Sequence, residues 1–194
     1  MKSDIILSGV GGQGIISIAS AIGGAALAND VHLKQAEVHG MSQRGGAVQS
    51  TLRLSSKPIA SDLIAYGAAD MILSIEPMES LRYLPYLKPE GWLVTNSVPF
   101  VNIDDYPDMD EVIAEIKKVK NHIIIDADGI AAKVATKRAS NMVLFGAATH
   151  FIDLPLESFK DGIRQIFAKK GDAIINSNID AMMAGREAAA EFLK

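Results

Sequence analysis

The 194-residue sequence contains no cysteine. This absence excludes disulfide bonds, zinc sites with cysteine ligands, and iron–sulfur clusters held by thiolates of this chain. Any such cluster that works together with this protein must therefore be held by another chain.

Long hydrophobic runs and an excess of positive charge are missing as well. No uninterrupted apolar stretch reaches the roughly 18 residues of a membrane-spanning helix, and the opening MKSDIILSGVGG predicts a first strand rather than a secretion signal. Lys and Arg number 19 against 23 Asp and Glu, so the net charge is −4. That balance argues against nucleic-acid binding through bulk positive charge. We expect a cytoplasmic protein without a membrane or nucleic-acid partner.

The apolar content is sufficient for a folded core. Hydrophobic residues make up 48% of a chain whose length suits one domain, so we expect residues 1–194 to form a single domain. Apolar runs predict strands at residues 4–8, 31–38, 47–54, 71–75, 92–95 and 122–125. Helices are predicted over residues 15–28, from Pro77, from the N-cap residue Asp108, and over most of 128–194. Residues 85–91 are predicted to form a turn, and 97–107 an excursion outside the sheet.

Alternation of strands and helices predicts a three-layer, Rossmann-like, doubly wound α/β fold with a largely parallel sheet and a helical C-terminal part. The connection between the strands at 31–38 and 47–54 is shorter than the dozen or so residues of a parallel crossover. These two strands could therefore pair antiparallel and make the sheet mixed.

A glycine-rich loop follows the first predicted strand and opens the first predicted helix. Gly9, Gly11 and Gly14 match the pattern G-x-G-x-x-G, with Gly12 and Gln13 between them. Glycines permit positive φ, which we expect at Gly11, and a helix N-terminus offers free N–H groups to an anion.

Three interpretations of this loop stay open. It could be a tight turn without a ligand, an anion or nucleotide site, or an NAD site with Glu37 on the ribose. The Gln13 amide both donates and accepts, which suits a contact to a polar ligand or to a neighbouring loop.

Residues 37–46, EVHGMSQRGG, form the densest polar cluster of the sequence. Arg44 carries a planar donor fork for a carboxylate or a phosphate, or else pairs with Glu37 and holds the loop. Glu37 and His39 share one face of an extended chain. The candidate ligand or subunit-contact residues here are Glu37, His39, Ser42, Arg44 and Gly45. We expect neither a catalytic residue nor a metal site on this chain.

Three motifs together resemble a known family. GVGGQGI at 9–15, EVHGMSQRGG at 37–46 and SIEPMESLRYLPYLKPEG at 74–91 resemble the gamma subunit or gamma domain of 2-oxoacid:ferredoxin oxidoreductases. The form HGMSQRGG is similar to the small subunit of the indolepyruvate branch. This family is not NAD-dependent, so the resemblance disfavours the NAD interpretation.

The resemblance implies an accessory subunit that is inactive alone. The complex would convert a 2-oxoacid, in this branch indolepyruvate or another aryl pyruvate, and CoA into acyl-CoA, CO₂ and reduced ferredoxin. Thiamine diphosphate, Mg²⁺ and 4Fe-4S clusters would belong to a large cysteine-rich partner chain in a hetero-oligomer. The two loops would then face that partner or shape the approach of CoA. The alternative is a stand-alone nucleotide- or CoA-binding module without redox chemistry.

Overall fold

The centre of the fold is one mixed β-sheet. The computed structural model describes residues 1–40 and 45–193, without the side chain of His39. The strands lie in the order β2-β3-β1-β4-β5-β6. Their bounds are β1 (Lys2–Val10), β2 (His32–His39), β3 (Ala47–Ser55), β4 (Ala69–Ser74), β5 (Leu87–Asn96) and β6 (His122–Ile125).

Strands β1, β4, β5 and β6 run parallel, whereas β3 is antiparallel to both of its neighbours, β1 and β2. The prediction that the second and third strands pair antiparallel is therefore confirmed. The short connection between them decides this, because it cannot carry the chain back to the other end of the sheet.

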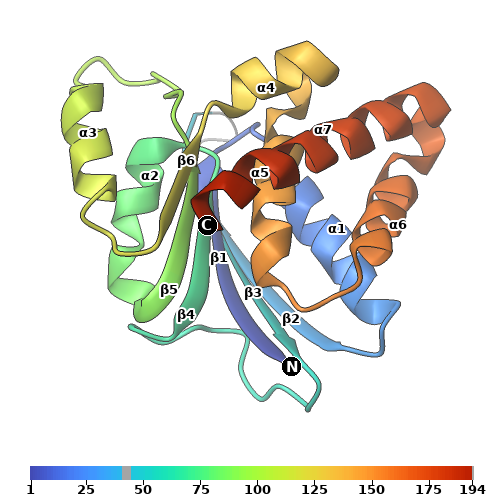
Figure 1. The fold of residues 1–194 in the computed structure, drawn as a ribbon. Coiled ribbons are helices and arrows are strands. Elements are labelled where there is room, and N and C mark those ends of the chain that lie inside the picture. Colours follow the sequence, from blue (N-terminus) through green and yellow to red (C-terminus); the bar gives the residue numbers. More distant parts are fainter. Residues whose placement is uncertain (41–44, 194) are drawn as a thin grey trace.

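Helices cover both faces of the sheet (Figure 1). One face carries α2 (Pro77–Arg82) and α3 (Met109–Ile116). The other carries α1 (Ile15–Leu27), α4 (Ala127–Val134), α5 (Ser140–Ala148), α6 (Leu156–Phe167) and α7 (Asp172–Ala190). Short 3-10 turns occupy residues 84–86, 137–139, 149–151, 168–170 and 191–193. The predicted doubly wound α/β fold with a helical C-terminal part is thus confirmed.

Two hydrophobic cores lie on opposite faces of the sheet. In β1, Ile5 and Leu7 pack into the core beneath α1 and α5, whereas Ile6 packs into the core beneath α2 and α3. Because successive side chains of a strand point to opposite faces, a strand buried on both sides is an unbroken apolar run. This explains why DIILS reads as continuous rather than alternating.

The predicted turn at residues 85–91 is wrong in part, because β5 already begins at Leu87. Pro85, Pro89 and Gly91 suggested a turn. Leu87 pairs with Ala69, and the register then shifts before Trp92 pairs with Met71. Pro89 is exposed and lies within this irregular stretch, where a missing backbone donor is tolerated.

The helices that follow β1 and β4 lie on opposite faces of the sheet, and this switch creates a place for a site. After β1 it continues into α1 on one face, and after β4 into α2 on the other (Figure 1). In open α/β sheets the crevice for ligands lies outside the carboxyl ends of the strands at such a switch point. Across the described residues, no helix is both long and apolar enough to cross a bilayer.

Candidate anion site at the carboxyl edge of the sheet

The glycine-rich loop turns the chain sharply from β1 into α1. Its positive φ angles include 100° at Gly12 and 85° at Gly14, but Gly11 is not among the positive-φ glycines. The expectation of positive φ at Gly11 is therefore wrong. Gly11 instead donates its backbone N–H to the carbonyl of Gly46, at 2.9 Å. This bond joins the two loops that the sequence marked as candidate sites.

Gln13 folds back onto the loop that carries it. Its Oε1 accepts a hydrogen bond from the backbone N–H of Val10 at 2.7 Å, and its own N–H reaches the carbonyl of Val10 at 3.2 Å. A Cβ atom added to Gly9 would lie 2.7 Å from the same Oε1. Gln13 was predicted to contact a polar ligand or a neighbouring loop, whereas these two bonds join it to the start of its own loop. Glycine at position 9 makes room for this brace.

The first turn of α1 starts at Gly14 without a side-chain cap from the described residues. Helices α5, α6 and α7 also begin without one, at Ala139, Pro155 and Gly171. The starts of α2, α3 and α4 differ, because each is capped by its own carboxylate, from Glu76, Asp108 and Asp126. An uncapped helix start leaves backbone N–H groups that need another partner.

The starts of α1, α5 and α7 all border one cavity of about 680 Å³. Three basic side chains line it: Lys137, Arg138 and Lys170. Gly12, Gln13 and Gly14 form another part of its wall. We call this cavity the basic pocket. Cationic side chains together with a glycine loop at a helix start are the arrangement that binds phosphate or carboxylate groups.

Sequence reasoning missed the three basic residues of the basic pocket. Lys137 and Arg138 lie in the short 3-10 turn before α5, and Lys170 lies in the one before α7. The stretch KVATKR at 133–138 was the available signal, since a basic run placed directly before a helix is unusual. Nothing in that local pattern shows that the run lies beside residues 12–14.

A second cavity of about 460 Å³ adjoins the basic pocket at the switch point and shares Gly12, Gln13 and Arg138 with it. We call it the switch-point cavity. Its wall includes Ile75 and Phe100 beyond the ends of β4 and β5. The switch-point cavity also carries charge, because Asp128 lines it together with Arg138. The two cavities share three residues, and we refer to them together as the carboxyl-edge site.

The second predicted loop is described only at its ends. Glu37 lies half-buried in β2, opposite Ser50 in the register with β3. His39 ends the same strand, and Gly45 has φ 79°. The predictions for Ser42 and Arg44 fall outside the described residues, and so does the proposed pair between Arg44 and Glu37.

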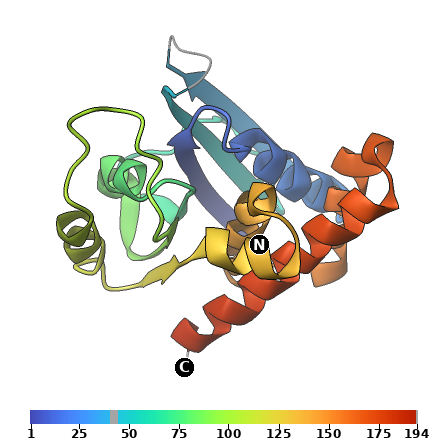
Figure 2. The ribbon, with the colours of Figure 1, turned by 90° about the horizontal axis from the view of Figure 1, so that it is seen from above.

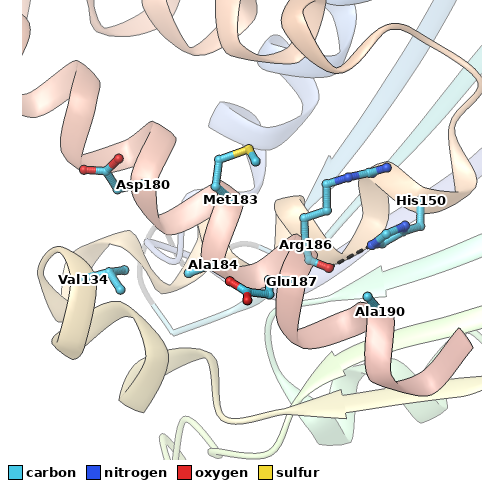
Figure 3. Close-up of a pocket in the computed structure, with 8 residues that line it drawn as sticks. All are labelled: Val134, His150, Asp180, Met183, Ala184, Arg186, Glu187 and Ala190. Carbon is cyan, nitrogen blue, oxygen red and sulfur yellow. Dashed lines mark hydrogen bonds between the residues drawn. The ribbon is translucent and has the colours of Figure 1, made fainter. Parts of the chain in front are cut away.

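The remaining histidines make structural contacts or lie away from this site. His122 Nδ1 lies 2.7 Å from the carbonyl of Val119, and His150 Nε2 lies 2.8 Å from that of Arg186. The His150 bond lies in a separate pocket along α7. Figure 3 shows the residues that line this pocket, among them Asp180, Met183 and Glu187. Within residues 1–40 and 45–193, no group of three or more His, Asp or Glu side chains is arranged to hold a metal ion.

Comparison with known proteins identifies the family. Residues 4–188 match the family described as pyruvate ferredoxin/flavodoxin oxidoreductase. Indolepyruvate oxidoreductase subunit IorB of Thermococcus kodakarensis is 36% identical over 200 residues, which cover 98% of this chain and 97% of that protein.

Two solved structures share the fold. The gamma subunit of the keto/oxoacid ferredoxin oxidoreductase from Geobacter sulfurreducens has a TM-score of 0.73 at 21% identity, covering 97% of this chain and 99% of its own. The 2-oxoglutarate:ferredoxin oxidoreductase from Magnetococcus marinus, solved with 2-oxoglutarate, coenzyme A and succinyl-CoA bound, has a TM-score of 0.77 at 20% identity. That match covers 98% of this chain but 31% of the other. The chain therefore belongs to the pyruvate ferredoxin/flavodoxin oxidoreductase family, as its three motifs predicted.

Proposed function

We propose that this chain is the accessory subunit of a cytoplasmic, thiamine-diphosphate-dependent ferredoxin oxidoreductase that acts on indolepyruvate or a related aryl pyruvate. The products would be the acyl-CoA, CO₂ and reduced ferredoxin. The relatives that carry the indolepyruvate name span nearly the whole chain, which supports this branch of the family.

The redox cofactors belong to a partner in this proposal. A chain without cysteine has no thiolate for a 4Fe-4S cluster. We assign thiamine diphosphate, Mg²⁺ and the clusters to a large cysteine-rich subunit, which also delivers electrons to ferredoxin. Thiamine diphosphate would supply the decarboxylation chemistry, and this chain would contribute to binding and orienting the second substrate.

The second substrate is CoA in this proposal. The main observation that supports a CoA site on this chain is the basic pocket. CoA is strongly anionic through its phosphates. Lys137, Arg138 and Lys170 line the same cavity as the glycine loop, on a protein whose net charge is −4, so the positive charge is local rather than general. The three basic side chains are exposed to solvent. A phosphate site of this kind at the surface would hold the nucleotide end of CoA and leave its thiol free to reach the partner.

The alternative is a stand-alone nucleotide- or CoA-binding module. One observation favours it: this chain supplies both the glycine loop and three basic side chains to the basic pocket. Such a module would bind CoA alone and would associate with no cofactor-bearing subunit.

Anaerobic affinity purification of the tagged chain from its native host distinguishes the accessory subunit from the stand-alone module. The accessory-subunit proposal expects a large partner, iron and thiamine diphosphate in the eluate. It also expects CoA-dependent reduction of a viologen dye with indolepyruvate, and slower reduction with pyruvate or 2-oxoglutarate. A chain that elutes alone and still binds CoA supports the stand-alone module. Faster turnover of 2-oxoglutarate or pyruvate would overturn the aryl specificity alone.

A further inference from the structure

The segment between β5 and α3 presents large apolar side chains to solvent. Residues 97–108, all of them described, contain neither helix nor strand. The exposed fractions are 37% for Val98, 44% for Phe100, 66% for Val101 and 46% for Ile103. Figure 2 shows this segment as a long arc on the side of α2 and α3. Solvent exposure of four such side chains within six residues is unfavourable unless another surface covers them.

The arc is nevertheless held firmly, and its main anchor is the buried carboxylate of Glu76. Glu76 is 0% exposed and caps α2 by accepting the N–H of Glu79 at 2.8 Å. Its other oxygen accepts the backbone N–H of Phe100 at 3.4 Å and the hydroxyl of Tyr106. Burial, and after it the hydrogen bond to Glu76, raises the pKa of Tyr106 well above its usual range. One carboxylate thus fastens both limbs of the arc to the start of α2.

A second anchor ties the tip of the arc to the carboxyl-edge site. Asn102 donates from its side-chain amide to the carbonyl of Gly45. The next residue, Gly46, accepts the N–H of Gly11 in the glycine loop. The arc is therefore hydrogen-bonded to the rest of the fold at both limbs and at its tip, which restricts the backbone that carries its apolar side chains. A surface ordered in advance loses less entropy when it binds.

We propose that residues 97–108 are the docking surface for the large, cofactor-bearing subunit, with Glu76 as the positioning residue that holds this surface in place. This inference rests on the proposed function. Val98 and Phe100 line the switch-point cavity as well as the arc, so the docking surface and the CoA site are continuous.

Two observations favour that occupant. The exposed apolar side chains of the first turn of α1 and of the end of β2, Ile16 at 52% and Val38 at 64%, lie at the same edge. In the Magnetococcus marinus enzyme a segment of this fold makes up 31% of a longer chain, so this fold also occurs within larger oxidoreductase polypeptides. Apolar patches with a polar rim are typical of protein–protein contacts.

The test compares assembly of the complex from tagged variants in the native host. The double variant V101D/I103D places two charges on the docking surface, and we expect at least about a tenfold loss in recovered partner. Leu27→Asp is the matched control, because Leu27 is 67% exposed at the opposite end of α1. It should recover as much partner as the wild type. Both variants should keep the wild-type thermal midpoint, since the changed side chains are exposed.

The role of Glu76 is tested separately with Tyr106→Phe, which removes one hydrogen bond to the carboxylate and leaves the ring. We expect faster amide exchange across residues 97–108, unchanged exchange in β1 and β4, and weaker assembly. If V101D/I103D recovers as much partner as the wild type, residues 97–108 are not the docking surface, and the proposed function still stands. Unchanged exchange in Tyr106→Phe would overturn the positioning role. A wild-type chain that recovers no partner would overturn the proposed function and the docking surface together.

Discussion

Asn141 donates a hydrogen bond from its side-chain amide to the carbonyl of Gly14, at 3.3 Å and across 127 positions of sequence. The contact joins the first turn of α5 to the start of α1. Both residues also line the basic pocket. The glycine loop is therefore held by a helix from the C-terminal part of the chain, and the shape of the pocket depends on that contact.

Gly14→Ala should destabilise the protein and distort the basic pocket. Gly14 has φ 85°, which costs an L-residue about 1–2 kcal/mol. A Cβ there would also overlap the amide of Asn141. We expect a loss of about 3 kcal/mol in the free energy of unfolding, measured by chemical denaturation.

Gly67→Ala is the matched control for that variant. Gly67 has φ 68°, but a Cβ there would meet nothing within 4 Å. It should lose only the backbone contribution of about 1 kcal/mol. If both variants lose the same free energy of unfolding, a clash with Asn141 adds nothing to the cost of alanine at position 14.

Arg138→Ala should weaken CoA binding in the assembled enzyme, because Arg138 lines both cavities of the carboxyl-edge site. We expect the KM for CoA to rise about tenfold, which corresponds to one charge-assisted hydrogen bond, with little change in kcat. Steady-state kinetics with a viologen acceptor measures both constants. Arg164→Ala on α6 is the control, since that side chain pairs with Glu157 and Asp161 away from the site. An unchanged KM for CoA in Arg138→Ala would show that CoA does not bind in the basic pocket.

Asp4→Asn should lower stability at neutral pH by about 3 kcal/mol. Asp4 is buried and receives two hydrogen bonds from Arg53, its partner in the register of β1 with β3. Burial alone raises the pKa of this carboxyl, but the hydrogen bonds and charges of Arg53 and Lys2 outweigh that effect and lower it.

The sign of the pH dependence follows from the lowered pKa of Asp4. Its contribution to stability is complete above the unfolded-state pKa of about 3.9 and is lost as the pH falls through the lower folded value. The difference between wild type and Asp4→Asn, followed by urea denaturation, should therefore shrink below about pH 4. Glu90→Gln removes an exposed pair with Lys120 and should have no measurable effect at any pH. A constant difference down to pH 2 would contradict this interpretation of Asp4.

Arg44→Ala stays a prediction from the sequence, because Arg44 lies outside the described residues. We expect lower activity or weaker assembly of the complex, with the thermal midpoint of the isolated chain unchanged. If the isolated variant unfolds, Arg44 is a structural brace, and its assignment to a ligand or partner contact fails.

Local patterns were sufficient for most of the secondary structure. The apolar run of β1 and the glycine loop after it placed the strand, the turn and the start of α1, because each depends on residues close together in sequence. The turn predicted at 85–91 is wrong from Leu87 onward, because Pro89 and Gly91 have the same local signature in a turn and at an irregular strand start. Whether a strand forms there depends on pairing with β4, which no local pattern contains.

Residue types and local patterns are enough to predict the fold class, the family and the lack of a thiolate-held cluster on this chain. No local pattern predicts that Lys137, Arg138 and Lys170 share a cavity with the glycine loop, or that Tyr106 meets Glu76. A sequence pattern specifies where an element begins and which face it buries. Which ends of distant elements meet is decided by strand order and by the packing of the whole sheet against its helices.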